Sequence, residues 1–565
     1  MPGKEPAYPD EFIGWLQRDK REIKGLDHLG VQTVSIAVYN LLLPGITNLT
    51  DRARYFSIFP WVLHSFAQLP DKKRSAIGWR NWIRSHEFAL VIASKTFEDK
   101  HDDPELSTKS IIGTDHTSRV LKSANDKTVI DIAGGSRLNS KGKVPRGAYF
   151  KNMEGGYRQY YKGALTKLGI LFVDEENRYP DRLVTKYAGL PLAKAVASTK
   201  GFDQLTEAAL GGSITVGDAV SLGELVHPGM IDPDGEESGL LRKILFGEEG
   251  GLCSGQDPRD IDLRRSSLSL ILRYISEEPV SQSEFPQEFR WAVMTGMLGD
   301  GKHWKIPKSL APMASAWAAY QRLELLNYAL ECLFWVAMYM VDERPSAPDV
   351  LADRIMKMAI APIKATNTNR ALPALEGSFE SSVRKAQVPK KIGGQFWGKE
   401  STWQWNSNLV DAEENQAICG WAARVLLRIV TDRGAFKSHP FEAIPEAVEI
   451  TSGHRISYKR WLDRAKARST ENIKAFLVDL VKEWVIFRHL RVATRKLANQ
   501  GVTTFKFRPH EGVIITSAET FPSPTYTNPR LVQAVQIMKD LHLVEARGGV
   551  MQLTKTGKKY LGLMT

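Results

Sequence analysis

The chain has 565 residues, so we expect several domains of ~100–200 residues each rather than one core. Hydrophobic residues make up 43% and charged residues 25%, a balance that is typical of globular proteins and excludes a largely disordered chain. Cys253, Cys332 and Cys419 stand far apart without a CxxC pair, which excludes a disulfide framework and a thiolate zinc site.

The formal net charge is +12, and it is concentrated at the C-terminal end. Residues 451–565 hold 20 of the 76 Lys and Arg and 8 of the 64 Asp and Glu, so residues 1–450 hold 56 of each. A neutral body with a basic end is typical of a protein that binds a polyanion through one region. The alternative interpretation is a solvated surface rich in Lys and Arg.

Neither a signal sequence nor a membrane span is predicted. Residues 1–8 lack an apolar signal region. The longest apolar run, residues 332–341, is about half of the ~20 residues that a spanning helix needs. We therefore expect a cytoplasmic protein that does not contact a membrane.

Residues 1–110 are predicted to form a helical domain. A short helix is expected at residues 12–16, and an apolar element at residues 31–43 ends at Pro44. Thr50 is the expected N-cap of a helix that runs on past Phe66, and Pro60 should kink or split that helix. A further helix carries aromatic residues at three- and four-residue spacing, namely Trp79, Trp82 and Phe88.

Residues 111–200 are predicted to contain a winged-helix-like module. A short strand is expected at residues 128–131, followed by a helix at residues 157–168. Two short strands with a turn between them occupy residues 170–185, and a helix begins after Gly189. Helix, strand, turn, strand and helix is the order of elements in a winged-helix module.

Residues 201–450 are predicted to be a central helical body. The strongest helical pattern covers residues 311–341, which are apolar enough for a buried central helix. Residues 277–287 are expected to be a linker. The loop at residues 384–397 mixes lysines with Phe396 and Trp397, which would suit base stacking or packing against the body equally well.

Residues 451–565 are predicted to form a long basic helix followed by a second winged-helix-like module. In that module a helix covers residues 529–541, and the strands 543–546 and 550–553 meet at the turn Gly548–Gly549. Residues 541–543 align with residues 168–170 of the first module. The predicted fold is therefore mainly α with small β-hairpins: a multidomain helical body with two winged-helix-like modules.

The basic end is predicted to contact nucleic acid because its cations alternate with aromatic residues along helices. Arg488, Arg491 and Arg495 have the spacing of one helix face, although cations there also complement the helix dipole. The predicted nucleic-acid-binding residues are Arg455, Lys459, Arg460, Arg488, Arg491, Arg495, Lys496, Lys506, Arg508, Arg530, Lys539 and Arg547.

The sequence favours a protein that is not an enzyme. It contains neither a phosphate-binding loop of the form G-x-x-x-x-G-K-[ST], nor a G-x-S-x-G elbow, nor an H-E-x-x-H helix. One cluster of acidic and histidine residues would suit a metal-dependent nuclease if it converged in space: His86, Glu87, Glu98, His101, Asp102, Asp103, Asp115 and His116. A solvated loop is the favoured interpretation, so no catalytic residue, metal or cofactor is predicted.

The segment at residues 42–55, with the sequence LLPGITNLTDRARY from Leu42, carries three charged side chains, Asp51, Arg52 and Arg54, among apolar ones. These charges predict a buried ion-pair network that fixes helix packing. Within residues 26–66, this segment resembles uncharacterised prokaryotic proteins encoded in phage-defence loci. The resemblance implies a subunit of a multi-protein antiviral defence system acting on or beside DNA.

Three functional interpretations follow. The first is a DNA-binding subunit that contacts double-stranded DNA beside a separate helicase or nuclease subunit. The second is an assembly scaffold whose winged helices bind protein. The third is a metal-dependent nuclease built on the cluster between His86 and His116.

Overall fold

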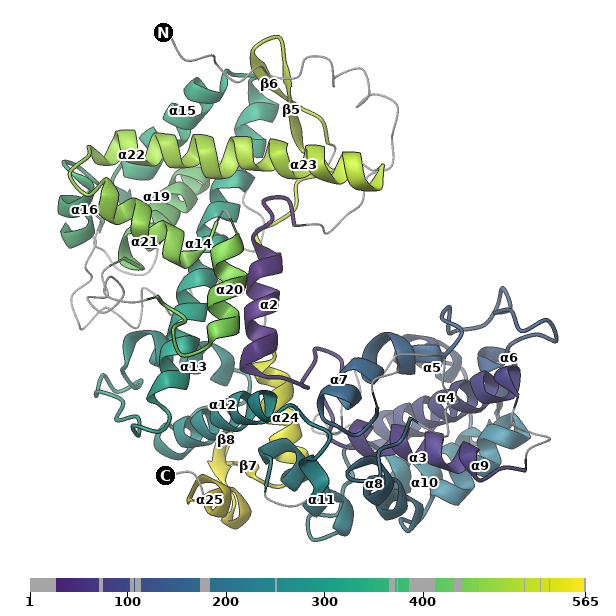
Figure 1. Ribbon diagram of the computed structural model, residues 1–565. Coiled ribbons are helices and arrows are strands. Elements are labelled where there is room, and N and C mark those ends of the chain that lie inside the picture. The colour runs from purple at the N-terminus through teal and green to yellow at the C-terminus, as the bar shows by residue number, and fades with distance from the viewer. Residues whose placement is uncertain are drawn as a thin grey trace. The chain divides into compact units, whose positions relative to one another are not determined.

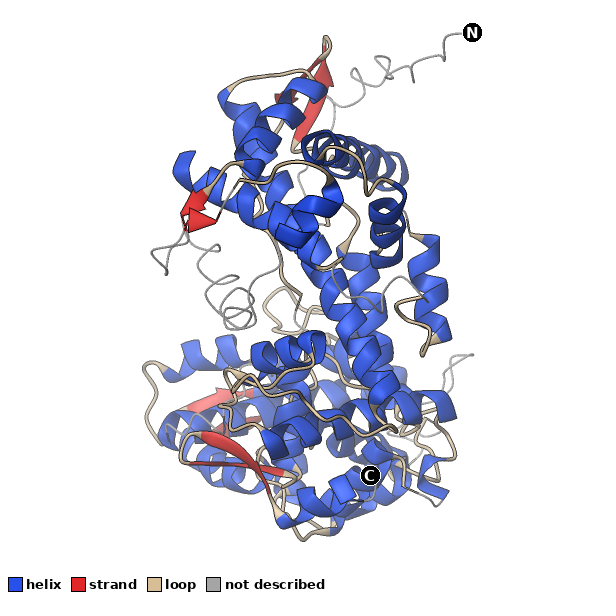
Figure 2. Ribbon diagram, turned by 90° about the vertical axis from the view of Figure 1, so that its left-hand side faces the viewer, coloured by secondary structure: helices blue, strands red, loops and turns tan. Residues whose placement is uncertain are grey.

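The computed structural model describes residues 27–70, 75–101, 106, 113–172, 183–248, 251–364, 371–372, 374–385, 412–430, 439–454, 456–501, 503–518, 520–527 and 529–562. Helices account for 62% of the structure, and the strands are few and short (Figure 2). This confirms the predicted mainly α fold with small β-hairpins.

The chain forms two compact units, each built from separate stretches. Unit 1 comprises Met1–Tyr39, Gln287–Ile306 and Ala314–Pro529, and unit 2 comprises Asn40–Pro286, Pro307–Met313 and Arg530–Thr565. None of the crossings between units falls at residues 110, 200 or 450, the boundaries predicted from sequence. The basic region is itself divided at residue 529, so its cations belong to two different units.

Unit 2 is a helical assembly in which α4 packs along α9 and α10, and α3 packs against α8 (Figure 1). Strand β1 pairs with β2, which confirms the short strand expected at residues 128–131. The elements of unit 2 are α3 (Tyr55–Ala67), α4 (Ala76–His101), α5 (Thr114–Leu121), β1 (Val129–Asp131), α6 (Ile132–Ser136), η4 (Tyr157–Tyr161), α7 (Lys162–Lys167), α8 (Gly189–Ala197), α9 (Phe202–Gly211), β2 (Ser213–Thr215), α10 (Val216–Val226), α11 (Glu236–Phe246), η6 (Gly251–Cys253), α12 (Pro258–Glu277), α24 (Leu531–Asp540), β7 (Val544–Arg547), β8 (Val550–Leu553) and α25 (Lys555–Gly562).

Helix α3 is the helix predicted between residues 50 and 66, but it begins at Tyr55. The hydroxyl of Thr50 lies 3.0 Å from the Thr47 hydroxyl and accepts the Thr47 backbone N–H, so Thr50 closes the preceding turn instead of capping the helix. The expected split at Pro60 does not occur. Proline removes only one helical hydrogen bond, and the buried neighbours Phe59 and Trp61 hold the helix together.

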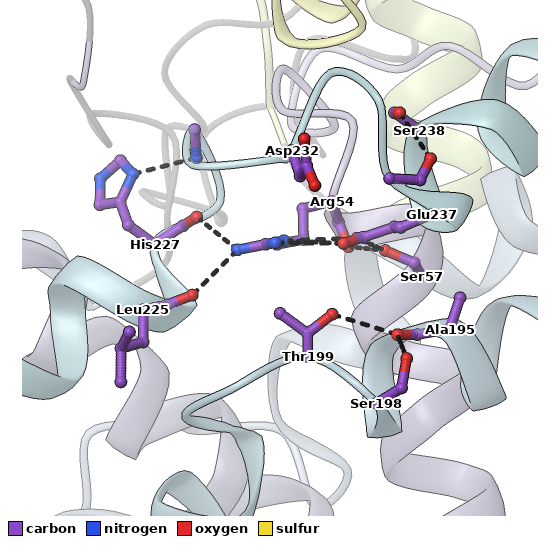
Figure 3. Close-up of polar contacts among 12 residues, drawn as sticks. Arg54, Ser57, Ala195, Ser198, Thr199, Leu225, His227, Asp232, Glu237 and Ser238 are labelled. Carbon is purple, nitrogen blue, oxygen red and sulfur yellow. Dashed lines mark hydrogen bonds and ion pairs between the residues drawn. The ribbon is translucent and has the colours of Figure 1, made fainter.

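Two buried ion pairs confirm the network predicted around residues 51–54. The Arg52 guanidinium lies 2.8 Å from the Asp540 carboxylate, and both side chains are at most 3% exposed. Arg54 pairs with Glu237 at 3.1 Å and also donates to the backbone oxygens of Leu225 and His227 (Figure 3). Breaking such a pair leaves an uncompensated buried charge, so these arginines tie the α3 region to α11 and α24.

Unit 2 contains one helix–hairpin–helix motif twice. The described part of the first copy is residues 157–172 and 183–197, in which Leu171 and Val184 form one antiparallel bridge. The second copy covers residues 531–562, in which β7 pairs with β8. In each, the residue after the first helix has a left-handed backbone, with φ of +63° at Gly169 and +54° at His542. The next residue donates its N–H back into the helix at 2.9 Å, from Ile170 to Leu165 and from Leu543 to Met538.

A threonine closes the hairpin in both copies. The Thr185 hydroxyl donates to the Gly169 carbonyl, and the Thr554 hydroxyl donates to the His542 carbonyl. Each hydroxyl then accepts an N–H at 3.0 Å, from Gly189 and from Gly557. The alignment of residues 168–170 with 541–543 is therefore repeated bond for bond.

Unit 1 is built around the long helix α14, most of which is buried, as predicted for residues 311–341. Helices α22 and α23 form one continuous rod through the π-helical turn η8 (Figure 1). The elements of unit 1 are α2 (Gln32–Leu42, which runs on into unit 2), α13 (Phe285–Thr295), α14 (Ala311–Glu343), α15 (Pro348–Ile360), β3 (Ile363–Lys364), β4 (Ala371–Leu372), α16 (Phe379–Lys385), α19 (Ala412–Arg428), α20 (Pro445–Gly453), α21 (Tyr458–Ala467), α22 (Ile473–Leu480), η8 (Val481–Ile486), α23 (Phe487–Gln500), β5 (Phe507–His510) and β6 (Val513–Thr516).

Helix α14 is long and apolar enough by length and composition to cross a membrane. Most of its apolar surface is buried by other parts of the protein, which is how the core helix of a globular unit appears. The helix is therefore no evidence for or against a membrane location. Two other predicted segments, the helix at residues 12–16 and most of the loop at residues 384–397, lie outside the described residues.

Candidate nucleic-acid interface

Of the three arginines predicted to share one face of α23, the first, Arg488, is buried. Arg488 is 8% exposed, and its guanidinium donates to the Leu29 carbonyl at 2.6 Å and the Gly30 carbonyl at 3.3 Å. Arg491 and Arg495 are exposed, and Arg491 donates to the backbone oxygen of Glu483. Arg488 therefore anchors the segment before α2 through two backbone oxygens.

Lys496 and Lys506 also have structural partners. The Lys496 ammonium donates to the Asp27 carbonyl at 2.7 Å. Lys506 is 3% exposed, and its ammonium donates to the Thr520 carbonyl at 3.0 Å. Arg508 on β5 is half-buried. Both lysine side chains donate to backbone carbonyl oxygens within unit 1. Such structural contacts can explain why the region is rich in Lys and Arg without any bound polyanion.

The polar face of α24 is occupied by contacts inside unit 2. Arg530 donates to the Ile46 carbonyl, and the Lys539 ammonium donates to the Gln282 side chain at 2.7 Å. Gln533 and Gln536, which share this face, bond to the Asn48 carbonyl and to Asp540. Arg530 and Lys539, at the start and end of this helix, therefore both have partners within unit 2.

The exposed cations of the second copy lie after α24. Arg547 stands beside the hairpin turn Gly548–Gly549 and is exposed. Lys555, Lys558 and Lys559 on α25 are also exposed. Their spacing of three and four residues places them on one face of the helix. The sequence prediction missed these three lysines, although that spacing was the signal that would have found them.

An open pocket beside α21 in unit 1 is lined by one exposed cation, Arg460, and by two half-buried ones, Lys459 and Arg464. It has a volume of about 570 Å³ and is lined by His439, Ser452, Ser457, Lys459, Arg460, Asp463, Arg464 and Trp484. Lys459 pairs with Asp463 one turn along the helix, whereas Arg460 is exposed. Two of the predicted binding residues therefore meet an aromatic side chain at one hollow. A third, Arg455, lies outside the described residues.

The histidine and acidic residues between His86 and His116 do not converge where they are described. The imidazole of His86 contacts the Trp82 carbonyl and the Thr206 hydroxyl, whereas Glu87 accepts the Gly156 N–H at 2.9 Å. Burial raises the pKa of Glu87 to about 8. Among the described residues, no three His, Cys, Asp or Glu side chains could hold a metal ion, and Asp102 and Asp103 lie outside them.

The cations of the basic region therefore separate into two kinds. Arg488, Lys506 and Arg530 are held by backbone oxygens of their own unit. Arg460 in unit 1 and Arg547 with the α25 lysines in unit 2 are exposed. No protein-family model, curated protein or solved structure matches the chain.

Proposed function

We propose that the chain is a DNA-binding protein whose second helix–hairpin–helix copy contacts the backbone phosphates of duplex DNA. The observation that carries this proposal is the face of α25. Lys555, Lys558 and Lys559 are all exposed there, and none of their ammonium groups has a hydrogen-bond or ion-pair partner among the described residues. Three cations without carboxylate partners repel one another, and phosphates relieve that repulsion while releasing counterions.

The second copy acts in this proposal as a winged-helix-like module that binds through its wing side. Helix α24, which precedes the hairpin, has its polar face bonded to residues 46–48 and 282. The hairpin tip at Arg547 and the face of α25 remain open. Phosphate contacts of this kind position a protein on DNA without reading its sequence, so weak sequence preference is expected.

The test is a salt series of duplex binding with the full chain. A deletion after residue 450 is unsuitable because it removes core residues from both units, among them Trp461 and Leu531. The variant carries Lys555→Ala, Lys558→Ala and Lys559→Ala. If each lysine contacts one phosphate, the slope of log K against log salt falls by about 0.9 per lysine removed.

A matched control removes three exposed lysines elsewhere in unit 2, Lys122, Lys127 and Lys141. It should bind duplex DNA like the unchanged chain. Equal losses in both variants would mean that net charge alone attracts DNA, and an unchanged α25 variant would refute the proposed contact. Absence of duplex binding by the full chain at low salt would favour the assembly scaffold instead.

The cellular setting remains a proposal that rests on the resemblance of residues 26–66 to proteins of phage-defence loci. A DNA-binding, non-enzymatic subunit in a cytoplasmic multi-protein system would act beside a helicase or nuclease subunit. Co-purification of the tagged chain from its own cells, with and without nuclease treatment, would separate protein partners from proteins bridged by DNA.

A further inference from the structure

The pocket beside α21 combines cationic side chains with an aromatic one. Binding to the phosphates of a duplex requires only the cations. Lys459 and Arg460 supply positive charge, and Trp484 supplies a flat aromatic surface. The guanidinium of Arg464 lies over the Trp484 ring at 5.5 Å from its centroid, and Asp479 holds that guanidinium in place. Aromatic rings and guanidinium planes are the surfaces on which unpaired bases stack.

The charges of the pocket indicate where a phosphate would be held. Arg464 is neutralised by Asp479 and Lys459 by Asp463. Arg460 is exposed, and its guanidinium has no hydrogen-bond or ion-pair partner among the described residues. Ser457, the N-cap of α21, lines the same pocket, so the positive end of the helix dipole adds to the field at that wall.

The size of the pocket limits its occupant. A volume of about 570 Å³ is in the range of sites for small molecules, so the pocket has room for one nucleotide. In a duplex the bases are stacked on one another and cannot reach a side-chain platform such as Trp484. An unpaired nucleotide presents both a free base face and a phosphate.

We propose that this pocket binds an unpaired nucleotide of single-stranded DNA, with the phosphate at Arg460 and the base against Trp484 and Arg464. The inference rests on the proposed function only in that both require DNA to be the ligand, since it names a different site in a different unit.

The experiment measures binding of the full chain to a labelled oligothymidine and to a blunt duplex by fluorescence anisotropy. Arg460→Ala and Trp484→Ala should each weaken binding of the single strand by about tenfold, since one stacked base contributes on the order of 1–3 kcal/mol. Trp484→Phe should restore most of the loss. Duplex binding should change by less than about twofold, because its proposed contacts lie on α25.

Two controls keep the outcomes distinct. Lys302→Ala removes a lysine of unit 1 that is 80% exposed and lies outside the basic region, and it should not alter binding. Because Trp484 is half-buried, thermal unfolding of its variants should be recorded, and the exposed Arg460 provides a variant with no packing to lose.

The outcomes separate the two proposals. If Arg460→Ala and Trp484→Ala both bind the single strand as tightly as the unchanged chain, the pocket proposal is wrong, whatever the α25 variant does. If thymidine monophosphate displaces the oligothymidine no better than inorganic phosphate at equal ionic strength, the base is not recognised and the proposal is also wrong. Loss of duplex binding in the α25 variant alone would support only the proposed function.

Discussion

The first copy of the helix–hairpin–helix motif has Gly169 at the left-handed position where the second copy has His542. A side chain at Gly169 would place its Cβ 2.8 Å from the backbone of Gly255, whereas His542 is exposed. The hydrogen bonds of the two copies are the same, so the motif itself tolerates a side chain at this position. The packing around the first copy is what requires glycine there.

The last residue of the first helix also differs between the two copies in its burial and its partner. Lys167 in the first copy pairs with Asp260 at 2.6 Å and is 54% exposed. The aligned residue of the second copy is Asp540, which is 2% exposed and paired with Arg52. The first copy thus carries a pair between an exposed lysine and a buried aspartate, whereas in the second copy both members of the pair are buried and bind the copy to the α3 region. The same backbone motif therefore occurs in two different packing environments.

The largest expected effect comes from breaking these pairs separately. Arg52→Ala should lower the free energy of unfolding by about 3–5 kcal/mol, because it leaves the Asp540 carboxylate buried without a cation. Lys167→Ala should lower it by about 1 kcal/mol, because the lysine is half exposed to water and its attraction to Asp260 is partly screened. Chemical denaturation of both variants measures the difference, and equal losses would show that the two environments are equivalent.

Both copies have a glycine near the start of the helix that follows the paired strands, Gly189 in α8 and Gly557 in α25. Substituting these glycines tests whether the two copies need the same close backbone approach. An added Cβ would lie 2.0 Å from the Leu543 carbonyl oxygen at Gly557 and 2.4 Å from the Ile170 carbonyl oxygen at Gly189. Gly557→Ala and Gly189→Ala should therefore each cost about 1–3 kcal/mol of stability. Gly163→Ala is the control, since nothing lies within 4 Å of its added Cβ, and it should be neutral or stabilising. A neutral Gly557→Ala would mean that the close approach is not needed.

A pH dependence of stability is expected from the second copy. Burial raises the pKa of Asp540 to about 6 from an ordinary value of 3.8. The folded protein therefore binds more protons than the unfolded chain between these values, so this group makes stability fall as pH rises through that window. Asp540→Asn should remove that part of the slope of unfolding free energy against pH. An identical slope in the variant would contradict the raised pKa.

Much of the helical framework follows from local sequence. The apolar residues of α14 recur at helical spacing, so residues 311–341 were predictable as a buried helix. The hairpin of the second copy was predictable from Gly548–Gly549 between two short apolar runs. The alignment of residues 168–170 with 541–543 was also readable, because turn geometry depends on nearby residues.

The sequence by itself determined the element types, the repeated motif and the concentration of positive charge after residue 450. Only the tertiary structure decided which of those charges face solvent, because Arg488 and Arg460 are equally basic in sequence and differ only in what packs around them. It also decided that the basic region belongs to two units and that Trp484 meets Arg460 at one pocket. Burial and partner choice depend on contacts between residues far apart in the chain, and local patterns do not specify those contacts.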